Sequence, residues 1–118
     1  IAKIAEKLNE TGVKCGIALL ANTPVSQVVD VLPFVQQLLI FSGNLGHQGG
    51  STADVSLLTK EKQAKKMNPS IELAWDGGVN EDNVEEIANG GIGVINVGGY
   101  IHSAANPEKQ YRRVQQKL

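Results

Sequence analysis

Hydrophobic residues are arranged along the chain in short, mainly apolar runs and in stripes at helical spacing. The runs span residues 15–21, 38–41, 71–75 and 92–97. The stripes begin near residues 1, 23, 54, 80 and 106. A run without alternation, such as residues 15–21, is typical of a strand covered on both faces, and stripes that repeat every three or four residues are typical of helices. The order predicts one helix followed by four strand–helix units, hence a parallel sheet joined by right-handed crossovers.

The four units have similar lengths, as in a barrel or in a doubly wound sheet. We expect a single domain over residues 1–118, because no linker or low-complexity segment interrupts the pattern. An open, flavodoxin-like sheet of four or five strands is the alternative that the pattern alone leaves open. The chain starts without methionine and inside a predicted helix, which leads us to expect further chain upstream.

Three local signals refine the predicted helices. Thr23 has the character of a helix N-cap, with Pro24 at the first helical position. Asn80 has the same character at the start of the helix that follows the third apolar run. The charge run of residues 60–66 lies within a lysine-rich predicted helix over residues 54–67. We interpret this run as a solvated helix face.

Composition and charge narrow the classes of partner. The chain has 118 residues, of which 42% are hydrophobic, and a net charge of −1. This balance provides no basic surface for nucleic acid or for an anionic membrane. No apolar stretch approaches the ~20 residues of a membrane span. The single Cys15 cannot form an internal disulfide, which agrees with an expected cytoplasmic location.

Glycine-rich segments follow the last three predicted strands. They comprise residues 46–49, with His47 and Gln48 between Gly46 and Gly49, then Gly77–Gly78 and Gly98–Gly99. Glycine lets backbone N–H groups approach an anion closely, and loops after parallel strands form the ligand-binding edge of α/β folds. Three such loops at one edge predict a phosphate site. The alternative for each glycine pair is a tight turn without a ligand.

Asp76 is the strongest single candidate for chemistry. It ends an apolar strand, between Trp75 and two glycines, where a carboxylate is poorly solvated and needs a partner such as a metal, a base or a substrate hydroxyl. The alternative is an aspartate that caps a helix or forms a turn. We interpret Trp75 and His102 as structural, and His47 as a loop-tip residue near the substrate.

Four segments resemble the ribulose-phosphate 3-epimerase family. Residues 16–24 resemble the family's fifth-strand pattern G-hydrophobic-A-L-N-P-x-T-P, and residues 41–50 resemble the sixth-strand pattern M-T-V-N-P-G-F-G-G-Q. Residues 75–80 match the seventh-strand pattern V-D-G-G-V-N. Residues 96–102 follow the eighth-strand pattern V-A-G-S-A-I-F in loose register. The resemblance spans nearly the whole chain, and D-G-G-V-N is its most specific element.

The resemblance implies a fold and a reaction. The family fold is a (β/α)8 TIM barrel, of which this chain would hold about the last four β/α units. The family inverts C3 of a ketose phosphate through an enediolate, with two aspartates and a divalent metal (Zn, Fe, Mn or Co). Asp76 matches the family aspartate that is both acid/base and metal ligand. The other aspartate and two metal histidines belong to the first half of the barrel.

The resemblance also assigns binding residues and partners. The positions that match the substrate and phosphate loops are Gly46, His47, Gln48, Gly49, Gly77, Gly78, Val79, Gly98 and Gly99. We expect a small ketose phosphate as ligand, a homo-oligomeric full-length protein, and no nucleic acid or membrane partner.

The chain departs from the family patterns at several loop positions. Leu20 and Ala21 replace Asn and Pro, Phe41 replaces Met, Leu45 replaces Pro, Gly50 replaces Gln, and Gly99 replaces Ser. These changes leave the identity of the substrate sugar undetermined. They also leave two alternatives, an inactive phosphosugar-binding or assembly domain and a related sugar-phosphate aldolase or decarboxylase.

Overall fold

Four strands and five α-helices form the regular framework of the described residues. The structure is a computed structural model that describes residues 1–46 and 50–118. The strands are β1 (Gly16–Leu20), β2 (Gln37–Phe41), β3 (Glu72–Asp76) and β4 (Val94–Asn96). The α-helices are α1 (Ala2–Glu10), α2 (Thr59–Met67), α3 (Val84–Asn89), α4 (Gly99–His102) and α5 (Pro107–Gln115). Three 3-10 helices join them, namely η1 (Val25–Val28), η2 (Leu32–Phe34) and η3 (Val55–Leu58).

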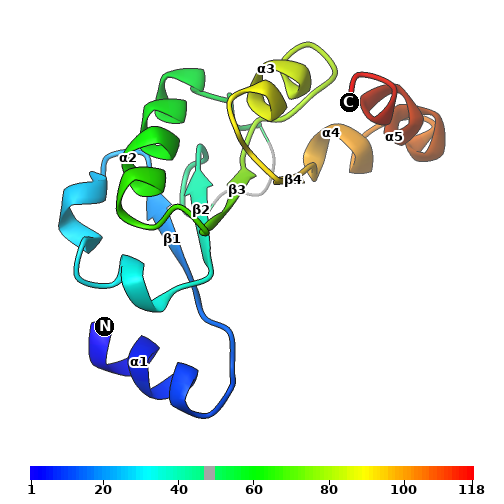
Figure 1. Cartoon of the computed structure of the whole chain (residues 1–118). Helices are drawn as coiled ribbons and strands as arrows, with labels where there is room; N and C mark the ends of the chain where they lie inside the picture. The colour runs from blue at the N-terminus through cyan, green and yellow to red at the C-terminus, as the bar shows by residue number, and fades with distance from the viewer. Residues whose placement is uncertain (47–49) are drawn as a thin grey trace.

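The strands form one parallel sheet in the order β1-β2-β3-β4. All four predicted strands are confirmed, and the parallel topology is confirmed with them. Figure 1 shows α1 at one end of the molecule and α4 and α5 beyond β4 at the other. Because every strand runs the same way, the loops after all four strands meet at one edge of the sheet.

One face of the sheet is packed against the helices. Leu19, Ile40 and Trp75 lie level with one another on neighbouring strands and are 3%, 0% and 0% exposed. They belong to a single apolar core that also contains residues of α2 and α3, among them Ala64 and Ile87. Burial of these large apolar side chains supplies the main favourable term for folding. We call this the closed face.

The other face is partly open. Ala18 and Asn96 are exposed, whereas Leu39, Phe41 and Asp76 are half-buried. The two edge strands, β1 and β4, each pair with a single neighbour in the described sheet. A curved sheet with helices on one face and an open second face is the arrangement expected of part of a (β/α)8 barrel. We call this the open face.

The predicted helix after Pro24 is wrong. The segment forms the two short 3-10 helices η1 and η2, and Pro24 itself is the N-cap of η1 without a side-chain cap from Thr23. The segment holds several β-branched valines, which have low helix propensity, and Pro33 removes a backbone donor. The last helix does begin as predicted, with Asn106 Oδ1 accepting a hydrogen bond from Lys109 N at 3.0 Å.

The interpretation of residues 60–66 as a solvated face is wrong for Lys60. This side chain is 7% exposed, and its Nζ donates to the carbonyl oxygens of Leu20, Ala21 and Thr23 at 2.7, 2.9 and 2.8 Å. Burial lowers the pKa of the Lys60 ammonium because the charged form loses solvation. The lysine therefore fastens α2 to the loop that follows β1.

Across the described residues, no helix has the length and apolar character that crossing a membrane requires.

Candidate functional site

A cleft of about 930 Å³ lies at the edge where the strands end. The strand register places Phe41, Asp76 and Asn96 side by side, each as the last residue of its strand on the open face. All three line the cleft, together with residues of the loops that follow β2, β3 and β4. The carboxylate of Asp76 and the side-chain amide of Asn96 therefore lie beside the three glycine-containing loops.

Most of the predicted site residues come together in this cleft. Its lining includes Asp76, Gly77, Gly78, Val79, Gly98 and Gly99. Gly46 is exposed and is not part of the lining. His47, Gln48 and Gly49 lie outside the described residues.

The structure adds lining residues that the motifs did not indicate. They are Ser51, Asn80, Asn96, Tyr100, His102 and Ser103. Their common signal in the sequence is position, because each lies at a strand end or in the segment that follows, which after β4 includes the short helix α4. His102, which we interpreted as structural, is exposed on α4 and lines the cleft.

Gly77 and Gly78 let the loop after β3 pack directly against the loop after β2. Both have left-handed backbone conformations, with φ of 111° and 70°. A Cβ at Gly77 would lie 2.6 Å from the carbonyl carbon of Ser42, and a Cβ at Gly78 would overlap Ala53 N. Close backbone packing therefore requires glycine at both positions. A phosphate role in addition stays a prediction.

Ser42 joins the same two loops by hydrogen bonds. Its backbone N–H donates to the Asp76 carbonyl oxygen at 2.7 Å, and its Oγ accepts from Asp54 N at 2.7 Å. The hydroxyl also donates to Thr52 O at 3.3 Å. The side chain is 6% exposed, so these partners satisfy a buried hydroxyl. The backbone that carries Asp76 is thereby held in place.

Asn80 does not cap a helix as predicted. The helix α3 begins later, at Val84, and Asn80 instead forms a polar turn in which its Oδ1 accepts from Asp82 N at 2.9 Å. Asn83 supports this turn from the other side, since its Nδ2 donates to Gly78 O at 3.0 Å. The asparagine pair holds the conformation of the cleft wall.

Trp75 has the structural role that we predicted. It is fully buried on the closed face, and its Nε1 donates to Gly77 O at 3.0 Å. Because Trp75 precedes Asp76 on the strand, its burial on one face directs the aspartate to the other.

The Asp76 side chain is half-buried at the cleft. Across residues 1–46 and 50–118 its carboxylate makes no hydrogen bond and no ion pair, so it neither caps a helix nor closes a turn there. The turn and capping interpretation is therefore not what the described structure shows. A carboxylate that has no internal partner is available to a ligand.

The resemblance implies one metal ligand in this chain, Asp76, and further ligands in the first half of the barrel. Among residues 1–46 and 50–118 no group of three or more His, Cys, Asp or Glu side chains is placed to hold a metal ion. A divalent transition metal usually takes at least three protein ligands. These residues therefore do not hold a metal by themselves, and a metal role for Asp76 stays a prediction.

Tyr100 adds a polar group between the loops after β3 and β4. The pKa of its phenol lies above the ordinary value, first because of desolvation and then because of the nearby Glu81 carboxylate. The phenol is therefore neutral over the physiological range of pH and acts as a hydrogen-bond donor.

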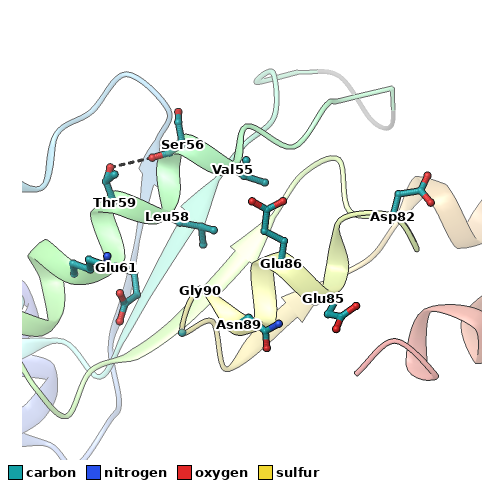
Figure 2. Close-up of a pocket in the computed structure, with 12 residues that line it drawn as sticks. Val55, Ser56, Leu58, Thr59, Glu61, Asp82, Glu85, Glu86, Asn89 and Gly90 are labelled. Carbon is teal, nitrogen blue, oxygen red and sulfur yellow. Dashed lines mark hydrogen bonds between the residues drawn. The ribbon is translucent and has the colours of Figure 1, made fainter.

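A second cleft of about 830 Å³ lies away from the strand ends, between η3, α2 and α3 (Figure 2). Its lining includes the carboxylates of Glu61, Glu85 and Glu86. None of the predicted site residues lines it. Its carboxylates would repel a phosphate ester, and it contains no strand-end residue. The second cleft is therefore a poor binding site for such a ligand.

Comparisons with known proteins agree with the fold. The chain superimposes on 3-hexulose-6-phosphate synthase with a TM-score of 0.72 and 16% identity, covering 99% of this chain and 55% of that chain. The tryptophan synthase of Pyrococcus furiosus gives a TM-score of 0.66 and 18% identity, with 98% and 50% covered. These neighbours are TIM-barrel enzymes, which confirms the predicted fold class and its share of about half a barrel.

Comparisons of sequence identify relatives at greater similarity. The ribulose-phosphate 3-epimerase of Mycobacterium leprae is 32% identical over 108 residues, which are 88% of this chain and 48% of the relative. The Aquifex aeolicus ribulose-phosphate 3-epimerase is 29% identical over 118 residues, covering 97% and 53%. The chain thus spans about half the length of the curated relatives that it matches.

The family model described as "Ribulose-phosphate 3 epimerase family" matches residues 1–102, which include every strand and the loops of the main cleft. The chain therefore belongs to the ribulose-phosphate 3-epimerase family.

Proposed function

We propose that this chain supplies one half of the active site of an epimerase that inverts C3 of a ketose phosphate, with Asp76 as a general acid/base. The observation that carries the proposal is the Asp76 carboxylate, which has no partner among residues 1–46 and 50–118, in a cleft shared with the Gly77–Gly78 and Gly98–Gly99 loops. Membership of the family and relatives named ribulose-phosphate 3-epimerase support it.

The reaction requires a base on each face of the reacting carbon. A carboxylate removes the C3 proton next to the carbonyl, and the electron pair moves into an enediolate. A second acid returns a proton to the opposite face, which inverts the centre. The described lining of the cleft contains Asp76 as its one carboxylate. We propose that the second acid comes from elsewhere in the complete barrel, so the 118-residue chain by itself should show no turnover.

We propose that the glycine loops bind the phosphate of the substrate. Gly77, Gly78, Gly98 and Gly99 line the same cleft as Asp76 and come from neighbouring strands. Loops after the last two strands of a barrel commonly hold a phosphate. A divalent cation would require ligands beyond Asp76, and these too would have to come from other residues.

A non-catalytic phosphosugar-binding role is the second candidate. The presence of a single carboxylate in the described lining favours it, because epimerisation needs two acids. The two functions differ in proton exchange, which only the epimerase catalyses.

The experiment is the Asp76→Asn substitution in the complete barrel, with deuterium incorporation from solvent into ribulose 5-phosphate as the readout. We expect a loss of about 10²–10⁴-fold in exchange, because asparagine cannot accept the proton. Binding of inorganic phosphate should stay unchanged, since the glycine loops remain. Exchange that survives in Asp76→Asn would contradict the catalytic role, and absence of exchange in the wild-type barrel would favour the binding role.

A further inference from the structure

We propose that Asn96 is a substrate-contacting residue whose side-chain amide binds an oxygen of the sugar next to the carbon that Asp76 addresses. The inference rests on the proposed function and deepens it, because it assigns the recognition of the sugar, as distinct from its phosphate, to a residue of β4.

The sheet places Asn96 beside Asp76. The two residues are register partners on β3 and β4, and both end their strands on the open face. Neighbouring strands lie about 4.8 Å apart, so a single small ligand can contact both side chains. Asp76, Asn96 and Gly98 also line an adjoining cleft of about 480 Å³ that is bounded by α5. The pair therefore lies where the two clefts meet.

The Asn96 amide has no structural task within the described residues. The residue is exposed, and its side chain makes no hydrogen bond to any residue in the ranges 1–46 and 50–118, whereas its backbone pairs with β3. Several other asparagines of the chain do hold the backbone, since Asn68 donates to Leu32 O at 2.9 Å and Asn83 donates to Gly78 O at 3.0 Å. Of the two asparagines that line the main cleft, Asn80 holds a turn, whereas Asn96 has its donors and acceptor available.

The fold does not explain an asparagine at this position. Asparagine is depleted in strands, where β-branched residues pack better. A contact with a ligand gives this side chain a role that packing in the sheet does not.

The chemistry of the amide matches the developing charge. Its Nδ2–H₂ group can donate to a carbonyl or hydroxyl oxygen of the sugar, and this bond strengthens when the enediolate places negative charge on that oxygen. The amide transfers no proton, which leaves the acid/base role to Asp76. Asn96 would thus favour substrates that have an oxygen at this position.

The test compares two substitutions of similar size in the complete barrel, Asn96→Leu and Asn89→Leu. Asn89 is an exposed asparagine of α3 that lines the second cleft, so it is the matched control. Dissociation constants for ribulose 5-phosphate and for inorganic phosphate are measured by calorimetry. We expect Asn96→Leu to bind ribulose 5-phosphate about five- to tenfold more weakly, which is the loss of one hydrogen bond. Its affinity for inorganic phosphate, and both affinities of Asn89→Leu, should stay unchanged.

Other outcomes separate this inference from the proposed function. An Asn96→Leu chain that binds both ligands like the wild type overturns the role of Asn96 and leaves the proposed function standing. Equal weakening of both ligands overturns it as well, because the phosphate site would then have been disturbed. Asn96→Ala is the second variant if leucine impairs folding, which circular dichroism shows. A wild-type chain that binds neither ligand overturns both the phosphate site and this inference.

Discussion

The two faces of the sheet differ in what their side chains do. On the closed face, Ile40 and Trp75 are fully buried and pack with the helices into one core. On the open face, the register partners Phe41 and Asp76 are half-buried, and Asn96 is exposed. The same three strands therefore supply stability on one side and accessible chemistry on the other.

This difference follows from the alternation of side chains along a strand. Successive residues point to opposite faces, so Trp75 anchors the strand through one face while Asp76 reaches the cleft through the other. The anchor is strong because a large aromatic side chain is removed from water. A site built in this way has a rigid support directly behind it, which helps to keep reacting groups in place.

The largest loss of stability should come from truncating Trp75, the side chain that anchors β3 in the core. We expect Trp75→Ala to lower the free energy of unfolding by about 3–5 kcal/mol, because it leaves a large cavity in the core. Phe41→Ala is the matched change on the open face and should cost about 1–2 kcal/mol, since its ring is half-buried. Urea denaturation measures both. Equal losses of unfolding free energy would contradict the conclusion that the closed face contributes more to stability than the open face.

A smaller loss of stability should come from a substitution in the loop after β3, which packs against the loop after β2. Gly78→Ala forces a Cβ against Ala53 N and a side chain into a left-handed conformation. We expect a loss of about 2–5 kcal/mol in the free energy of unfolding, again measured by urea denaturation.

Gly98→Ala is the control for this change, because Gly98 lines the same cleft but a Cβ at this position would meet nothing within 4 Å. Its φ is −103°, outside the left-handed region in which Gly78 lies. A Gly98→Ala chain as unstable as Gly78→Ala would show that close packing is not the reason for the glycine.

The smallest effect should come from the buried lysine. Lys60→Met keeps the apolar stem but leaves the carbonyl oxygens of Leu20, Ala21 and Thr23 without their donor. We expect a loss of about 1–3 kcal/mol in the free energy of unfolding. Lys62→Met is the control, because that side chain is exposed on the same helix and should change stability little. An unchanged urea midpoint for Lys60→Met would contradict the anchoring role of its ammonium.

Several features of the site are predictable from the sequence. Asp76 stands out because a carboxylate that ends an apolar strand needs a partner, and the glycine pairs stand out because they follow strands. Asn96 does not, since a single asparagine in a short apolar run has no motif of its own. The burial of Lys60 is equally hidden, because a lysine within a charge run resembles its solvated neighbours.

Local pattern determined the strands, their parallel order and the edge at which chemistry gathers, because hydrophobic periodicity and strand ends are properties of neighbouring residues. Tertiary structure alone decided which residues share the cleft, which glycines are required by packing, and where the Lys60 ammonium lies. Those facts depend on contacts between segments far apart in the chain. Gly78 meets Ala53, and Lys60 meets Leu20, only after the strands have aligned their ends.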